Sequence, residues 1–399
     1  MSTRRQFLKA GVITAGSFAI PWKLGRANSH TSPPLDPALI PKFVDPLPIP
    51  TVLEPQGQSR NSASYKVTMT ELQQQVLPAG FPATTVWGYE GSYPGPTIEA
   101  RRNKPVSVKW INELPNRHIL PIDTTLHGSE PWQPEVRTVV HLHGAHTKPQ
   151  FDGYPEDWYT SNQRKNFAVF TYKNDQEPAA LWYHDHAVGN TRLNVYAGLA
   201  GVYNIRDDFE DALNLPSGVY EIPLVLQDRS FTEDGALFYP SESDVPTAPV
   251  PSVIPIFAAD TIVVNGKTWP YLEIEPRKYR FRVLNGANGR PFRLQITPDA
   301  APGTSLPFHQ IGTDGGLLDA PVMVGKRGAD GKPAGPQVTV APAGFSKNHI
   351  SIALFNHFSV FCLGDKFFET NARNLFPFKS PGPVAHIADK QRAFANQLF

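Results

Sequence analysis

Four of the twelve histidines in this 399-residue sequence form two His-x-His pairs, His141 with His143 and His184 with His186. Side chains at positions i and i+2 of a β-strand point to the same face, so each pair would present two imidazoles side by side. Neutral imidazoles are good ligands for zinc, copper, iron and nickel. The spacing alone also fits polar residues on a solvated strand face, or histidines that donate hydrogen bonds inside a core. Both interpretations stay open at this point.

The segments that carry these pairs have the pattern of buried strands. Residues 137–143, 180–186 and 199–205 are short apolar runs of the kind found in sheet interiors. Proline accounts for 41 of the 399 residues, about twice its ordinary share, and charged residues for only 18%. Because proline breaks helix interiors, this content disfavours a helical protein. We therefore expect an all-β fold in which long connections join short strands.

Strand patterns fall into two blocks, which predict two β-sandwich domains. The first block covers 50–207 and includes alternating apolar residues at 65–69 and 106–110. Between 207 and 218 the pattern lapses into acidic and turn residues, which we interpret as a linker. The second block covers 219–343. Its strand patterns occur at 220–226, 261–264, 278–284, 292–296 and 337–340. Such a series fits Greek-key sandwiches or barrels.

Residues 1–27 have the composition of an export signal. They contain five basic residues and no acidic one, and Arg4-Arg5 precede the apolar run 10–20. This run is too short to cross a bilayer, which takes ~20 residues, so no membrane span is expected. The arginine pair followed by Phe-Leu-Lys resembles a twin-arginine signal. That resemblance implies export by the twin-arginine machinery to the periplasm or the exterior, a route used by proteins that fold, often with a cofactor, before crossing.

Charge argues against nucleic acid binding, and cysteine content excludes an intrachain disulfide. Without the first 27 residues the chain has 32 basic and 36 acidic residues, a net charge of −4. No basic stripe remains, so no nucleic acid partner is expected. Cys362 is the only cysteine and cannot form an intrachain disulfide.

Longer motifs around the histidines resemble those of a known family. The motifs are HLHG at 141–144, DGYP at 152–155 and LWYHDH at 181–186. They resemble the first-domain copper motifs of the multicopper oxidases, above all those of spore-coat laccases and bilirubin oxidases. Further similar segments lie at 93–98, 197–201, 260–267 and 279–286. The resemblance runs from about Tyr93 to Ala343.

This resemblance implies cupredoxin-like Greek-key β-sandwich domains with copper as the cofactor. By position, His141 is similar to a ligand of the type 2 copper, and His143, His184 and His186 to type 3 ligands of the same trinuclear cluster. Asp152 is similar to an acidic residue that helps proton delivery near the dioxygen channel, but an aspartate before a glycine also fits a simple turn. The implied reaction takes electrons from a phenol, a bilirubin-like pigment or a metal ion and reduces dioxygen to water.

The sequence departs from the family pattern in its last part. In this branch a third cupredoxin domain supplies a His-x-x-His-x-His cluster and a His-Cys-His run. After His186 no two histidines stand two or three positions apart, and Cys362 lies between phenylalanine and leucine. We therefore expect a chain truncated before the third domain, with half of the trinuclear ligands, no type 1 copper and no full activity of its own.

Residues 344–399 do not continue the resemblance. They contain 10 of the 24 phenylalanines and show no clear period. We expect an irregular tail, from out-of-frame translation or joined sequence, and the alternative is an apolar capping segment on the second domain. For the whole chain the alternative function is that of an exported cupredoxin-type protein that binds copper or is structural without being catalytic.

Overall fold

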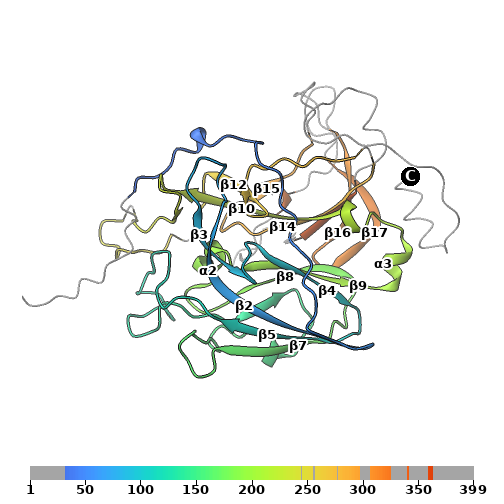
Figure 1. Ribbon diagram of the computed structural model, residues 1–399, viewed down its shortest axis with the longest axis horizontal. Helices are drawn as coiled ribbons and strands as arrows, with labels where there is room; N and C mark the ends of the chain where they lie inside the picture. Colours follow the sequence, from blue (N-terminus) through green and yellow to red (C-terminus); the bar gives the residue numbers. More distant parts are fainter. Residues whose placement is uncertain are drawn as a thin grey trace, which may run out of the picture.

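The computed structural model describes residues 32–243, 245–254, 257–275, 277–296, 306–324, 339–340 and 358–362. These residues are built mainly from β-strands, and their α-helices are short: α2 (Thr191–Ala197) and α3 (Asp208–Ala212) (Figure 1). The predicted all-β class is confirmed. The predicted signal at 1–27 and most of the predicted tail lie outside the described residues. Within the described part, no helix is long and apolar enough to span a membrane.

The first domain is a sandwich of two sheets. The outer sheet contains β1 (Gly57–Gln58), β2 (Ala63–Gln74), β3 (Thr84–Tyr89), β5 (Val106–Asn112) and β7 (Phe167–Tyr172). The inner sheet contains, in spatial order, β4 (Gly95–Arg101), β9 (Ala200–Arg206), β8 (Ala179–Asp185) and β6 (Val140–His143). β2 pairs with β5 and β4 with β9 in parallel, whereas β6, β8 and β9 are antiparallel neighbours. Two parallel neighbours cannot be joined by a tight turn and need a crossover connection. Between β2 and β5 the chain passes through β4 of the other sheet, so these connections link the two sheets.

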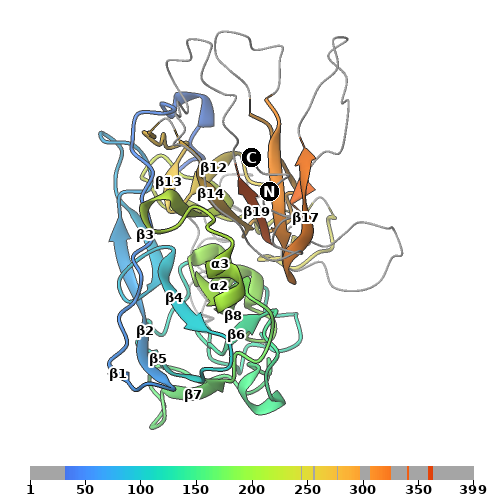
Figure 2. The same cartoon turned by 90° about the vertical axis from the view of Figure 1, so that its right-hand side faces the viewer.

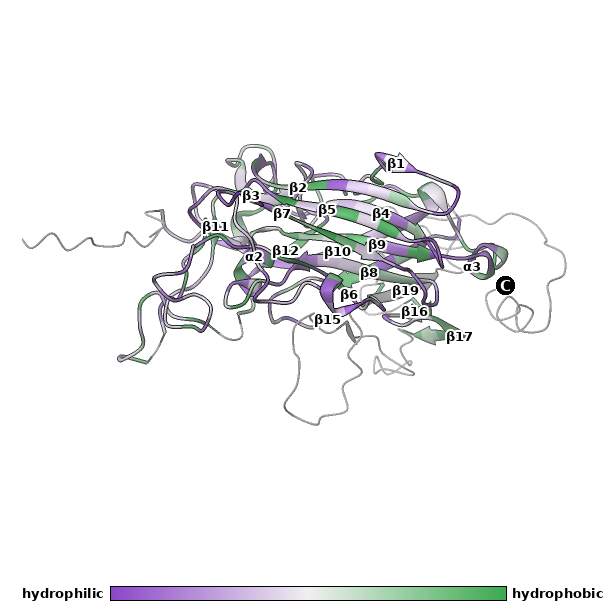
Figure 3. Ribbon diagram, turned by 90° about the horizontal axis from the view of Figure 1, so that it is seen from below, coloured by the Kyte–Doolittle hydropathy of each residue, from purple (hydrophilic) through white to green (hydrophobic). Residues whose placement is uncertain are grey.

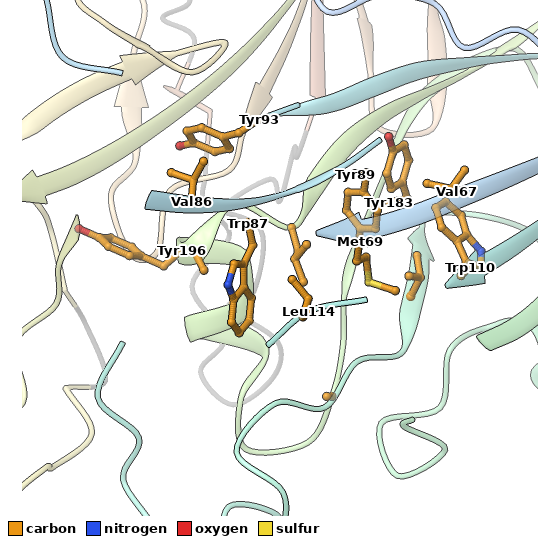
Figure 4. Close-up of a cluster of buried hydrophobic side chains, with 14 of the residues drawn as sticks. Val67, Met69, Val86, Trp87, Tyr89, Tyr93, Trp110, Leu114, Tyr183 and Tyr196 are labelled. Atoms are coloured by element: carbon orange, nitrogen blue, oxygen red, sulfur yellow. The ribbon is translucent and has the colours of Figure 1, made fainter. Parts of the chain in front are cut away.

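Alternating residues of the outer sheet fill the core between these two layers. In β2 the side chains of Tyr65, Val67 and Met69 are buried, as the predicted period of two requires. Trp110 of β5 lies 5.1 Å from the ring of Tyr183 of the inner sheet (Figure 4). In Figure 3 apolar residues recur along the strands between polar ones. Burial of each large apolar side chain contributes about 1.5–3 kcal/mol to stability.

The second domain is organised around one large sheet. Its strands, in spatial order, are β13 (Lys267–Thr268), β12 (Thr261–Val264), β10 (Glu221–Phe231), β14 (Arg280–Asn285), β19 (Phe358–Cys362), β16 (Phe308–Thr313) and β17 (Gly316–Val324), and β11 (Leu237–Phe238) pairs with β10. A small separate sheet joins β15 (Phe292–Arg293) to β18 (Thr339–Val340). β19 belongs to the segment predicted as an irregular tail. The second sheet therefore includes residues beyond position 343.

The inner sheet of the first domain is covered on both faces. One face packs on the outer sheet, and the other meets the second domain, which Figure 2 shows above it. Trp182 and Val202 of the inner sheet form an apolar cluster with Val225 of β10 and Leu284 of β14. All seven residues of β8 are buried as a result. A strand covered on both sides reads as a continuous apolar run, which explains the pattern seen at 180–186.

The predicted linker at 207–218 contains helix α3, which carries a buried acid. Asp207 caps the helix by accepting a hydrogen bond from the Glu210 amide at 2.8 Å. The Oε1 atom of Glu210 lies 2.6 Å from Arg280 Nη2 and 2.7 Å from Arg282 Nη2, both on β14. Arg206 of β9 also contacts it, at 3.1 Å. This acidic segment looks solvent-exposed in sequence, but its Glu210 contacts arginines of both domains.

Glu221, at the start of β10, shares the same three arginines. Its Oε1 atom lies 2.7 Å from Arg206, 3.3 Å from Arg280 and 2.6 Å from Arg282. We call Arg206, Glu210, Glu221, Arg280 and Arg282 the interdomain ion cluster. Burial and neighbouring Arg282 lower the pKa of Arg280 to about 10, so its guanidinium stays charged at neutral pH. The cluster therefore places three guanidiniums against two carboxylates across the domain boundary.

An extended N-terminal segment, residues 32–58, ties the domains together on the outside. We call it the strap; it contains the 3-10 turn η1 (Pro37–Leu39). The Leu35 amide donates to the Phe231 carbonyl of β10 at 2.8 Å, and the Leu47 amide to the Tyr271 carbonyl at 2.7 Å. Further along, the Leu53 amide donates to the Thr97 carbonyl of β4 at 2.8 Å. The strap thus begins on the second domain and ends on the first.

Candidate metal centre

Strands β6 and β8 bring the two His-x-His pairs together at the edge of the inner sheet. They are antiparallel neighbours, with His141 directly opposite His184, while His186 follows the end of β8. The His141 ring lies 5.4 Å from His143, 5.5 Å from His184 and 4.8 Å from His186, measured between centroids. All four imidazoles named from the sequence therefore form one cluster.

Three of the four residues already have nitrogens at ligand-like separations. One ring nitrogen from each of His141, His143 and His184 lies within 4.8 Å of the other two. Nδ1 of His143 is 3.2 Å from Nε2 of His184. Two nitrogens bound to one tetrahedral ion at ~2.0 Å would lie about 3.3 Å apart, so this pair needs little adjustment to share an ion.

Backbone carbonyls fix the tautomers of three rings. Nδ1 of His141 lies 2.5 Å from the Asp152 oxygen, Nδ1 of His184 2.7 Å from the Asp185 oxygen, and Nδ1 of His186 2.9 Å from the Gly153 oxygen. A carbonyl oxygen can only accept, so each Nδ1 carries the hydrogen and donates it. The lone pair of each ring is then on Nε2. Metal-binding histidines in proteins are oriented in this way, and the donor set fits copper.

Burial keeps His141 and His184 in the neutral form that binds metals. Desolvation, together with neighbouring His141 and His143, lowers the pKa of His184 well below its ordinary value. Desolvation also lowers the pKa of His141, against the opposing hydrogen bond to the Asp152 carbonyl. Neutral rings at neutral pH need lose no proton before they bind a metal ion.

Asp152 lies beside the cluster but within a turn. It follows the 3-10 turn η2 (Pro149–Phe151) in helical backbone conformation, and its side chain is half-exposed. Its Oδ1 atom is 3.4 Å from Nδ1 of His141, whose hydrogen the Asp152 carbonyl already accepts. The position fits a turn residue and also leaves a carboxylate at the solvent side of the imidazoles.

Asp185 and Trp182 support the cluster from the strand that carries His184. The buried Asp185 carboxylate accepts from the Val139 and Ala187 amides at 3.0 and 3.1 Å, and from Asn194 Nδ2 at 2.6 Å. It faces away from the imidazoles, and burial raises its pKa to about 7. Trp182 stacks on the His184 ring at 4.1 Å. Both side chains hold the strand in place, as the alternation along it predicts.

His146 stands outside the cluster. It is exposed, and its Nδ1 atom lies 2.8 Å from the Asp175 carboxylate. Sequence motifs do not reveal a different contribution to the cluster, that of the main-chain oxygens of Asp152 and Gly153. The only signal that a sequence can give for such a role is the glycine itself.

Known proteins match this chain in sequence and in fold. Residues 71–139 and 133–210 match the family model described as Multicopper oxidase. A laccase from Bacillus subtilis (strain 168) is 51% identical over 292 residues, 71% of this chain and 56% of that protein. A laccase from Haloferax volcanii is 42% identical over 339 residues, 82% of this chain and 55% of that protein. The chain thus spans little more than half the length of these curated relatives.

Solved structures share the fold. A laccase from Pediococcus acidilactici Pa5930 superimposes with a TM-score of 0.62 at 26% identity, covering 88% of this chain and 67% of that one. McoA multicopper oxidase from the hyperthermophile Aquifex aeolicus gives a TM-score of 0.61 at 23% identity, covering 88% of this chain and 68% of that one. The resemblance to the multicopper oxidase family noted in the sequence is confirmed.

Proposed function

We propose that this chain is part of a laccase-type, copper-dependent oxidoreductase that takes electrons from an organic or metal-ion reductant and reduces dioxygen to water. The observation that carries the proposal is the convergence of four imidazoles, three of them fixed as Nδ1–H tautomers. The relatives named laccases support the same reaction class. A phenol, a bilirubin-like pigment or a metal ion would serve as the reductant.

The four histidines would hold copper in the roles expected from the family motifs. His141 would bind the type 2 copper, and His143, His184 and His186 would bind the type 3 coppers. Bound copper supplies one-electron redox chemistry and a place for dioxygen to bind. The protein supplies orientation through the three carbonyls. The Asp152 carboxylate, 3.4 Å from His141 Nδ1, is the group we propose for proton delivery from solvent.

We infer that the four imidazoles alone hold copper weakly. The family's trinuclear cluster also takes ligands from a third cupredoxin domain, and the 399 residues contain no His-x-x-His-x-His motif. A ligand set that is incomplete leaves coordination positions to water and lowers affinity. The strongest binding is expected where His143 Nδ1 and His184 Nε2 stand 3.2 Å apart.

Copper stoichiometry tests this proposal. After equilibrium dialysis against copper and then metal-free buffer, the purified chain is expected to retain well below three copper ions per molecule. The variant His184→Ala/His186→Ala is expected to retain less still. His146→Ala is the matched control, because this exposed imidazole lies outside the cluster and its removal should leave the copper content unchanged.

Two outcomes would contradict the proposal in different ways. A chain that retains no copper at any concentration would favour the non-catalytic structural protein, a candidate supported by the missing His-Cys-His run. Three tightly held ions would show that another molecule supplies the remaining ligands.

We also propose export by the twin-arginine route to the periplasm or the exterior. The double substitution Arg4→Lys/Arg5→Lys keeps the charge but removes the arginine pair, so it is expected to leave the precursor in the cytoplasm. Cell fractionation followed by immunoblotting measures the distribution. Arg26→Lys serves as the control, since it makes the same change at an arginine outside the motif. Normal export of the double variant would rule out this route.

A further inference from the structure

One turn holds an imidazole from each His-x-His pair. The carbonyl oxygens of the consecutive residues Asp152 and Gly153 accept hydrogen bonds from His141 on β6 and from His186 after β8. The two rings stack, with centroids 4.8 Å apart and an angle of 26° between their planes. A single dipeptide therefore determines how two rings from different strands lie relative to each other.

Only glycine allows this turn to approach β6 so closely. Gly153 has φ +77°, in the left-handed region that favours glycine. A Cβ atom there would lie 2.2 Å from the Val140 oxygen and 3.0 Å from the Cα atom of His141. Both are backbone atoms of the strand that carries the first pair, so neither can yield without moving a ligand. Any larger residue must push the turn outward and draw the two carbonyls away from the rings.

The turn is anchored on both sides by contacts that do not involve the imidazoles. The Phe151 ring packs against Phe170 of β7, with centroids 6.5 Å apart. On the other side, the Pro155 carbonyl accepts from the Val188 amide at 3.1 Å. Because these contacts involve no imidazole, they hold the turn independently of the groups that would bind a metal ion.

We propose that Gly153 is a positioning residue: through the carbonyls of 152 and 153 it sets the Nδ1–H tautomer of His141 and His186 in the metal-free protein and directs both Nε2 lone pairs into the cluster. The importance of this role for copper rests on the proposed function. His184 provides an internal reference, because the carbonyl that its Nδ1 contacts belongs to Asp185 on its own strand rather than to the turn.

Long-range ¹H–¹⁵N spectra of the metal-free full chain, labelled at histidine, report the tautomer of each ring. In the wild type, His141, His184 and His186 are expected to carry the hydrogen on Nδ1. In Gly153→Ala, His141 and His186 are expected to lose this preference while His184 keeps it. The dissociation constant for copper is expected to rise about 10–100-fold, the usual effect of removing a partner of a ligating histidine.

Two variants separate this role from general strain. Gly91→Ala introduces a side chain at φ +69° with no atom within 4 Å, so it carries the same conformational cost without displacing the turn. Asp152→Asn changes the carboxylate and keeps the carbonyl. Both are expected to retain the wild-type tautomers.

The inference is overturned if either His141 or His186 of the metal-free wild type carries its hydrogen on Nε2, or if both tautomers persist in Gly153→Ala. Should Gly153→Ala fail to fold, Phe151→Ala loosens the anchor instead, and unchanged tautomers there also count against it. A wild type with the expected tautomers that binds no copper would refute the proposed function and leave the positioning role intact.

Discussion

The copper-loaded 399-residue chain is expected to lack intense blue absorption and to oxidise phenols no faster than free copper does. A blue-copper site needs a cysteine thiolate together with two imidazoles. Cys362 is the only cysteine, and its neighbours in sequence are Phe361 and Leu363. The strand register places Cys362 opposite His309 of β16, and His309 opposite Met323 of β17. The paired residues Cys362, His309 and Met323 include one imidazole, whereas a blue-copper site takes two.

Absorption spectroscopy measures the colour, and oxygen consumption with a phenolic substrate measures the rate of oxidation. The rate is compared with that of an equal concentration of copper in buffer, and with that of His184→Ala/His186→Ala. Cys362→Ser is expected to change neither colour nor rate. A blue protein whose colour and turnover disappear in Cys362→Ser would contradict the prediction and establish a type 1 site on β19.

Substitution of Glu210 by glutamine is expected to lower the free energy of unfolding by about 3–5 kcal/mol, the usual cost of breaking a buried ion pair. Glu210 is 4% exposed, and its Oε1 atom contacts three guanidiniums within 3.1 Å. Without its charge, the described carboxylates that remain beside these arginines are Glu221 and Glu99, and Glu99 pairs with Arg206 at 2.8 Å. Urea denaturation followed by fluorescence measures the loss.

Asp211→Asn is the matched control on the same helix. Asp211 is exposed and pairs with Arg101 at 2.6 Å, and a surface ion pair contributes about 0–1 kcal/mol. Equal losses in the two variants would show that the helix, rather than the buried charge, is responsible.

The interdomain ion cluster also predicts that the fold loses stability in acid. Burial opposes ionisation of Glu221, but Arg282, Arg280 and Arg206 outweigh it and lower its pKa from 4.5 to about 2, and the pKa of Glu210 is also lowered. A carboxylate with a lowered folded-state pKa stabilises the protein fully above its unfolded-state pKa, and this contribution is lost as the pH falls from 4.5 through 2. Glu221→Gln should therefore show a shallower loss of stability over this range.

The alternation of apolar and polar residues along strands allowed much of the first domain and of the site to be predicted. It identified the buried faces of β2 and β5, the bounds 261–264 of β12 and the pairing of imidazoles within each strand. The order of the strands within the sheets could not be predicted in this way. That β6 lies beside β8, with His141 opposite His184, depends on tertiary packing that no local pattern encodes.

Other elements could not be predicted because their partners are remote or their pattern is broken. β17 contains Pro321, which interrupts a strand signal and is tolerated because β17 is an edge strand. The sequence of helix α3 resembles a solvated acidic stretch because two of the three arginines that contact Glu210, Arg280 and Arg282, lie about 70 positions away. The carbonyls of 152 and 153 act through the main chain, which leaves almost no trace in residue type.

The strap sets an order of events during synthesis. Ser32 contacts Asp234, 202 positions later in the chain, and Asp45 contacts Lys267, 222 positions later. At 5–20 residues per second the ribosome needs roughly 10–40 s to make the intervening chain. The earliest described residues must therefore wait, undocked, while the first sandwich and the β10–β11 hairpin emerge. The strap can therefore close only after the chain has emerged through Tyr271, which is before strands β14, β16, β17 and β19 of the second domain are made.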